Sequence, residues 1–377
     1  ILAFFTYFKC SCVCSAWCPH LPACYSSSES GRCERVKTNN RKTIEMKKIR
    51  NTNLDLLKIM ACVGVVLLHT TMPGFKETGS WNYLTYLYYL GTYSIPLFFM
   101  VNGYLLLGKN EISYSYILQK IKWILVTVSI WTLIIWIYKR DFPENPIKKV
   151  LGSLLQRGYF FQFWFFGALI LIYLCLPILK KFLKSKKRYL LVLSVLVIIG
   201  LVVELTNILL QMPLQSYVIQ TFRLWTWFFY YILGGFLAQF SLDTLKKCFR
   251  SWMKEITVVL LFASPLILFM LAKYIHHNLF AEYFYDSIFV KVVSLGTFLT
   301  VLTFDLNTDK NRWIIYLSNQ TMGVFVIHTY VMKVWEKLVG FSFAGAHLLF
   351  LIFTLSVSFI VVGILMKIPY FNRIVKL

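Results

Sequence analysis

Of the 377 residues, 58% are apolar and 18% aromatic, whereas only 15% are charged. Soluble domains carry about 25% charged residues, so this composition excludes an ordinary soluble protein and indicates a polytopic membrane protein. The formal net charge of +23 does not indicate nucleic-acid binding. The Lys and Arg residues stand in short connections between apolar runs, and no folded soluble domain is left to present a basic face.

The first 45 residues differ from the rest of the chain. They include six of the nine cysteines, between Cys10 and Cys33, and then become polar and irregular. They lack the basic start and the long apolar core of a secretory signal, and the cysteines lack the second ligand pair of a zinc site. We therefore interpret residues 1–45 as a non-native or disordered extension, and 46–377, which opens on Met46, as one membrane domain. No metal site is predicted.

Runs of about 20 apolar residues, the length that crosses a bilayer, recur from residue 54 to residue 366. They predict an all-α fold of about ten transmembrane helices without a soluble insertion. The predicted spans are 54–72, 84–107, 121–138, 160–179, 189–210, 219–240, 256–275, 286–304, 313–335 and 342–366.

The orientation follows from the basic residues outside these spans. Lys and Arg are concentrated in the segment before the first span, in the even-numbered loops and in the C-terminal tail, with a dense group in 180–188. Cytoplasmic loops carry the excess of Lys and Arg, and an even number of spans leaves both ends of the domain on one side. Both termini are therefore predicted to be cytoplasmic.

The first span contains three ionisable residues, Asp55, Lys58 and His69, in an otherwise apolar helix. Ionisable groups inside a span are costly, and they usually face a cavity or a site. Eleven residues at 3.6 per turn rotate the helix by about 1,100°, so Lys58 and His69 share one face, separated by roughly 16 Å along the axis. Lys58 lies towards the cytoplasmic end and His69 towards the outer end. Alternatively, Lys58 extends to the inner interface and pairs with Asp55.

Four further polar residues are predicted in the outer half of the helical bundle. Glu204 lies in the fifth span, Arg223 opens the sixth, Lys291 lies in the eighth and His328 in the ninth. A lone histidine in an apolar helix more often bonds a neighbouring helix than performs chemistry, and Glu204 with Arg223 or Lys291 also fits a structural ion pair. Composition and spacing alone leave a transporter and a membrane enzyme equally open.

Five segments resemble, in order, motifs of the integral-membrane acyltransferase family 3. NLDLLKIMACVGVVLLHTT resembles its first helix, in which a basic residue and a histidine are separated by ten residues, as Lys58 and His69 are. Two departures are Lys58, where the family commonly has Arg, and Asn102, where it commonly has Ser before Gly103. The other four segments are IPLFFMVNGYLLL, FWFFGALILIYLCLPIL, FFYYILGGFLA and LSNQTMGVFVIHTYVM.

The resemblance implies that 46–377 is a membrane acyltransferase domain of the surface-polysaccharide O-acetyltransferase type. Such a protein moves an acyl group, usually acetyl, from cytoplasmic acyl-coenzyme A to a hydroxyl of a cell-surface glycan or glycolipid outside the membrane. An imidazole titrating near neutrality can take the proton of the attacking hydroxyl. His69 is accordingly predicted to be catalytic, either as that base or as the acylated group.

The same resemblance implies the partners and the residues of the donor site. Lys58 is predicted to be catalytic and, with Asp55, Asn102 and Gly103, to bind acyl-coenzyme A. The predicted partners are the bilayer, acyl-coenzyme A and the glycan, in a cell membrane of the bacterial plasma-membrane type, with no tightly bound cofactor and no nucleic acid. The alternative is a transporter of a small polar solute, although no pair of Gly/Pro-broken helices supports it. The acceptor end is assigned to Glu204, Arg223, Lys291 and His328 from their depth in the bundle alone, without support from the resemblance.

Overall fold

The computed structural model describes residues 50–306, 311–343 and 345–369. The chain divides after Asn51 into two units, and the second, Thr52–Leu377, contains all the helices named below. The described residues form helices and connections without a strand, as predicted. The extension predicted for 1–45 lies outside the described residues, so that interpretation stays a prediction.

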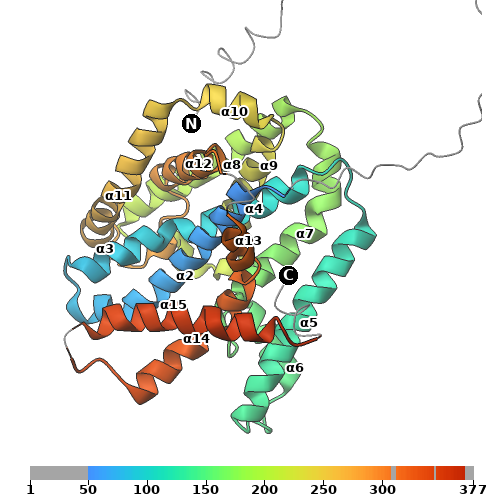
Figure 1. Cartoon of the computed structure of the whole chain (residues 1–377). Helices are drawn as coiled ribbons and strands as arrows, with labels where there is room; N and C mark the ends of the chain where they lie inside the picture. The colour runs from blue at the N-terminus through green and yellow to red at the C-terminus, as the bar shows by residue number, and fades with distance from the viewer. Residues whose placement is uncertain (1–49, 307–310, 344, 370–377) are drawn as a thin grey trace, which may run out of the picture. The chain divides into compact units, whose positions relative to one another are not determined.

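The helices follow one another with short connections (Figure 1). Several of them begin at a side-chain cap: the side-chain oxygen of Asn82 accepts from Leu84 and Thr85, and that of Ser185 accepts from Arg188. Such caps satisfy backbone N–H groups that the first helical turn leaves without partners. The α-helices are α2 (Thr52–Thr78), α3 (Tyr83–Leu90), α4 (Ser94–Leu107), α5 (Tyr114–Tyr138), α6 (Pro146–Leu154), α7 (Trp164–Phe182), α8 (Lys186–Leu210), α9 (Leu224–Leu237), α10 (Leu242–Cys248), α11 (Ser251–Tyr274), α12 (Ile288–Leu302), α13 (Arg312–Ser318), α14 (Thr321–Leu338) and α15 (Ala346–Leu365).

Among the described residues, seven helical stretches are long and apolar enough to cross a membrane. They coincide with seven of the ten predicted spans, so the all-helical prediction is confirmed and these seven stretches are candidate membrane spans by length and composition. They are Thr52–Lys76, Tyr83–Leu107, Tyr114–Tyr138, Phe161–Phe182, Lys186–Leu210, Ser251–Tyr274 and Ala346–Leu365.

The other three predicted spans correspond to shorter helices. α9 has 14 residues and α12 has 15, so each is about 21–23 Å long, less than the roughly 30 Å of a hydrocarbon core. The run predicted at 313–335 is divided between α13 and α14 at Asn319 and Gln320. The 3₁₀ segments η4 (Gln220–Phe222) and η5 (Ala281–Tyr283) precede α9 and α12, and the Gln220 amide in the first donates to the Glu282 carboxylate in the second.

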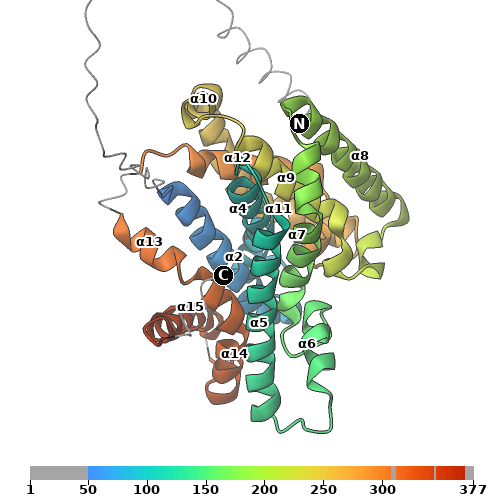
Figure 2. The ribbon, with the colours of Figure 1, turned by 90° about the vertical axis from the view of Figure 1, so that its right-hand side faces the viewer.

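α2 lies in the middle of this unit. It packs against α3, α4, α12, α13, α14 and α15, and it lies among them in both views (Figures 1 and 2). Leu57, Ala61 and Val66 on α2 are completely buried. The Asn53 amide near its start donates to the carbonyl oxygens of Val301, Leu302 and Phe304, at 2.7–3.0 Å. These bonds satisfy carbonyls at the end of α12 and hold the start of α2 against it.

α4 and α9 approach each other closely because both carry glycine at their crossing. A Cβ atom on Gly103 would lie 1.8 Å from the carbonyl oxygen of Tyr231, and one on Gly234 would lie 2.0 Å from that of Met100. Small residues permit such close contact between helix backbones in membrane proteins. Gly103, which the resemblance assigned to the acyl-coenzyme A site, therefore lies in the packing contact between α4 and α9.

Candidate functional site

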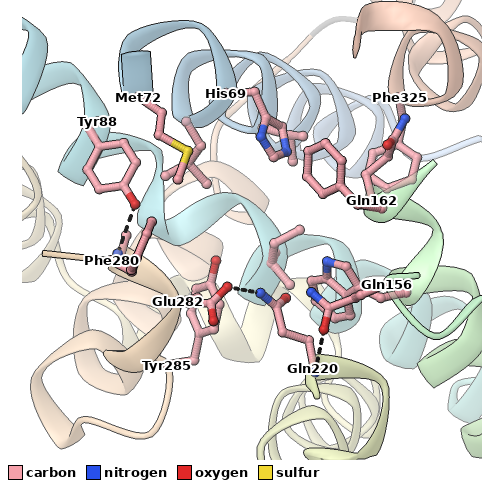
Figure 3. Close-up of a pocket in the computed structure, with 16 residues that line it drawn as sticks. His69, Met72, Tyr88, Gln156, Gln162, Gln220, Phe280, Glu282, Tyr285 and Phe325 are labelled. Carbon is pink, nitrogen blue, oxygen red and sulfur yellow. Dashed lines mark hydrogen bonds between the residues drawn. The ribbon is translucent and has the colours of Figure 1, made fainter. Parts of the chain in front are cut away.

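A cavity of about 130 Å³ lies beside α2, closed by several helices and by the segment between α11 and α12. Cavities of this size hold several water molecules. Figure 3 shows His69 on one side of it and Glu282 with Gln220 on the other. The lining residues are Val65, Leu68, His69, Met72, Tyr88, Ile95, Gln156, Phe161, Gln162, Trp164, Gln220, Phe280, Ala281, Glu282, Tyr285 and Phe325.

Two of the predicted histidines meet beside this cavity. The His69 ring is stacked against the His328 ring, with centroids 5.3 Å apart and 29° between the planes, and Phe161 contacts His69 edge-on at 5.2 Å. His69 is half-buried, whereas His328 is completely buried on α14. Their 259-residue separation in the chain means that only packing of α2 against α14 could bring them together.

The hydrogen bonds of His328 define its tautomer. Its Nδ1 lies 2.8 Å from the carbonyl oxygen of Phe325 and 3.1 Å from that of Val324. A carbonyl can only accept, so Nδ1 carries the proton. In the neutral ring Nε2 is then an acceptor, and this buried atom has no hydrogen-bond partner among the described residues. This atom is covered by protein, and His328 itself does not line the cavity.

Glu282 opposite His69 is held by an ion pair and an amide. The Arg223 guanidinium donates to the Glu282 carboxylate at 3.1 Å and to its backbone carbonyl at 3.3 Å. The Gln220 side-chain amide also donates to the carboxylate, and the Gln220 backbone N–H donates to the Gln156 side chain at 2.9 Å. These contacts join the segment before α9 to the segment before α12, and they fix the carboxylate at the cavity wall (Figure 3).

Gln162 occupies the same side of the cavity as His69. Its amide nitrogen donates to the Thr329 hydroxyl at 3.0 Å and to the carbonyl oxygen of Val326 at 3.2 Å. Both partners belong to α14, so Gln162 connects the start of α7 to the helix that carries His328. The Gln162 side-chain oxygen is buried without a partner among the described residues.

Asp55 and Lys58 lie nearer the start of α2 and do not line this cavity. Lys58 Nζ is 3.4 Å from the Asp55 carboxylate, which also accepts from the Ser318 hydroxyl at 2.7 Å. The Lys58 side chain is 29% exposed and Asp55 is 2% exposed. The helix is continuous from Thr52 to Thr78, so Lys58 and His69 occupy one face of it as predicted, but only His69 reaches the cavity.

Glu204 and Lys291 each bond a backbone group at or just before the start of α12, and neither lines the cavity. The Glu204 carboxylate accepts from the Ile288 backbone N–H at 3.1 Å, at the helix N-terminus, where a negative charge is stabilised. Lys291 Nζ donates to the carbonyl oxygen of Asp286 at 2.6 Å. Both side chains therefore hold the segment that presents Glu282, and they do so without touching His69 or His328.

Asn102 and Gly103 also lie outside the cavity lining. The Asn102 amide donates to the carbonyl oxygen of Phe98 in its own helix at 2.9 Å, and its side-chain oxygen accepts from the Tyr173 hydroxyl at 3.4 Å. The structure thus brings His69 and His328 together, and it places Arg223 behind Glu282, which lines the same cavity. It separates from them the residues predicted to bind acyl-coenzyme A.

Reasoning from the sequence missed Glu282 and the three glutamines. That reasoning considered ionisable residues inside apolar spans, whereas Glu282 lies in a connection and Gln156, Gln162 and Gln220 carry no charge. Glu282 stands among aromatic residues in AEYFYD. An acid among aromatic residues was the feature of the sequence that could have indicated a site here. In the part of the chain that the structure describes, no group of three His, Cys, Asp or Glu side chains could hold a metal ion.

The chain matches a known protein family over most of its length. A family model described as an acyltransferase domain, that of acyltransferase family 3, matches residues 51–366. No curated protein and no solved structure matches the chain. The match includes all of α2 to α15, together with the cavity described above. The chain therefore belongs to acyltransferase family 3, and its long apolar helices make it a multi-pass membrane acyltransferase.

Proposed function

We propose that this protein transfers an acetyl group from acyl-coenzyme A to a hydroxyl of a cell-surface glycan. The observation that carries the proposal is the half-buried His69 at a cavity with His328 beside it and a fixed carboxylate opposite. His69 takes the proton of the acceptor hydroxyl as its oxygen attacks the thioester carbonyl carbon. The carbon–sulfur bond then breaks, and the proton passes to the departing coenzyme A thiolate.

The direct test is coenzyme A release by the purified full chain in lipid nanodiscs. The protein is supplied with acetyl-coenzyme A, with or without a cell-envelope glycan preparation, and free thiol is measured over time. We expect thiol release that depends on the glycan and acetyl esters on the recovered glycan. Solute uptake into proteoliposomes without any thioester cleavage would instead establish a transporter.

We assign the donor end to Lys58, with Asp55, Asn102 and Gly103. The Lys58 side chain is partly exposed, with its ammonium group next to Asp55, and an ammonium can pair with a phosphate of coenzyme A. His328 and Arg223 belong to the acceptor end in this proposal, together with Glu204 and Lys291, which support the start of α12.

We expect Lys58→Ala to raise the KM for acetyl-coenzyme A about tenfold or more and to change kcat little, because one phosphate contact is lost. Lys58→Arg should retain the wild-type KM or lower it, since Arg adds a bidentate fork for phosphate. Initial rates at varied acetyl-coenzyme A measure both parameters. An unchanged KM in Lys58→Ala would remove Lys58 from the donor site.

We further propose that the shorter helices α9 and α12 and the divided pair α13 and α14 add to the seven long stretches to make ten spans in the cell membrane, with both termini cytoplasmic. The distribution of Lys and Arg supports this orientation, and it places His69 towards the outside and Lys58 towards the cytoplasm. A reporter fused after Leu377 is expected to report cytoplasm, and one inserted near Gly79 is expected to report the exterior. The reverse pattern would exchange the donor and acceptor ends.

A further inference from the structure

Among the described residues that line the cavity beside His69, the formal charge is negative and comes from Glu282. Among its lining residues in the described part of the chain, Glu282 is the only acid, and there is no Lys or Arg. An anion placed in such a cavity would lose its hydration without gaining a cation, and it would face the Glu282 carboxylate. The lining therefore disfavours phosphate and carboxylate groups.

Arg223 does not offer its positive charge to an anion in the cavity. Its Nε donates to the carbonyl oxygen of Val218 at 2.8 Å, and its two terminal nitrogens both donate to Glu282. The guanidinium also lies over the Tyr283 ring, 5.3 Å from its centroid, and the residue is only 4% exposed. Its charge is thus directed at Glu282 from behind the wall, and it fixes the carboxylate rather than offering a site to a ligand.

The partly exposed Glu282 carboxylate at the cavity wall can only accept hydrogen bonds. The side-chain oxygens of Gln162 and Gln220 are buried without partners among the described residues, as is His328 Nε2. Their amide nitrogens already donate to Thr329 and Glu282, respectively. These three acceptors are covered by protein atoms, so the Glu282 carboxylate is an acceptor that a ligand hydroxyl in the cavity can reach.

We propose that Glu282, held by Arg223 and Gln220, is a specificity-determining residue that restricts this cavity to an uncharged, hydroxyl-rich part of the acceptor. Its carboxylate accepts a hydrogen bond from a second acceptor hydroxyl while the first faces His69 across the cavity. The diphosphate of coenzyme A and acidic sugars are excluded from this space. The inference deepens the proposed acyl transfer and rests on it for the role of His69.

The test compares two glycosides that differ only at C6: methyl α-D-glucopyranoside, which is neutral, and methyl α-D-glucopyranosiduronate, which is anionic. Binding to the full chain in phosphatidylcholine nanodiscs is measured by saturation-transfer NMR titration in 150 mM salt. We expect the wild type to bind the neutral glycoside about tenfold more tightly, as one unfavourable charge contact would produce. The net charge of +23 favours the anion elsewhere on the protein, so this preference must arise locally.

We expect Glu282→Gln to reduce the preference to about threefold or less. Because that change leaves the buried Arg223 charge without its partner, the double variant Arg223→Gln, Glu282→Gln provides a charge-balanced second case with the same expected loss. Glu336→Gln, on an exposed position of α14, should retain the wild-type ratio.

Three results would overturn the proposal: no binding of the neutral glycoside, equal or tighter binding of the uronate by the wild type, or an unchanged ratio in both Glu282 variants. None of these binding results depends on thioester cleavage. A failure of acyl transfer is therefore detected separately, as absent thiol release in the nanodisc assay with the glycan preparation.

Discussion

Alanine in place of His69 is expected to abolish acyl transfer while leaving the protein folded. Loss of a general base typically lowers a rate by about 10²–10⁴-fold, and His69 is placed at the cavity where an acceptor hydroxyl can reach it. Its ring contacts are with Phe161 and His328, so their loss should cost little stability. The rate of thiol release from acetyl-coenzyme A with glycan present measures the effect, and size-exclusion chromatography measures folding.

His277→Asn is the matched control for that experiment. His277 is exposed and has a positive φ of 46°, a conformation that asparagine also tolerates. The control should keep the wild-type rate. If His69→Ala released coenzyme A at the wild-type rate with acceptor present, the assignment of His69 as the base would be wrong.

Gly103→Ala is expected to prevent correct assembly of α4 on α9. The added Cβ would lie 1.8 Å from the carbonyl oxygen of Tyr231, and backbone atoms on both helices would have to move apart. Overpacking in a closely packed core typically costs about 1–3 kcal/mol, and a clash with backbone belongs at or above the upper end. We expect loss of the monodisperse peak in fluorescence-detected size-exclusion chromatography and a lower unfolding temperature.

Gly363→Ala on α15 tests the same substitution where the nearest neighbour is the end of a side chain and not backbone. Its Cβ would lie 3.1 Å from the Tyr316 hydroxyl, the end of a side chain that can shift, so a wild-type elution profile is expected. A folded Gly103→Ala protein with only a raised KM for acetyl-coenzyme A would show that Gly103 acts in donor binding and that the helix contact is not critical.

Local patterns in the sequence were sufficient to predict where the long helices of the domain lie in the chain, including the one that carries His69. The 18 residues from Leu54 to Thr71 are apolar with three ionisable exceptions, and helical periodicity alone put Lys58 and His69 on one face. Seven long spans follow from the same logic, because a chain inside a bilayer must satisfy its own backbone hydrogen bonds. The lengths of α9 and α12 do not follow from it, since polar contacts in the neighbouring loops determine where these helices start.

Helical periodicity and composition did not predict the hydrogen-bond and ion-pair partners of the charged residues. The sequence left open a pairing of Glu204 with Arg223 or Lys291, whereas Arg223 pairs with Glu282 and Glu204 accepts from the Ile288 backbone. These contacts join residues 59 and 84 positions apart. Helical periodicity relates residues within one helix, so it cannot predict contacts between residues so far apart in the chain.

By itself, the sequence determined that this is an all-helical membrane protein of acyltransferase family 3 with Lys58 and His69 on one helical face. Both conclusions depend on composition, local spacing and motif order, which a linear chain displays. Only the tertiary structure decided that His69 and not Lys58 lines the cavity, that His328 stacks beside it, and that Glu282 faces it. The physical reason is that these arrangements arise from the packing of α14 and of the segment between α11 and α12 around α2, which joins residues far apart in the chain.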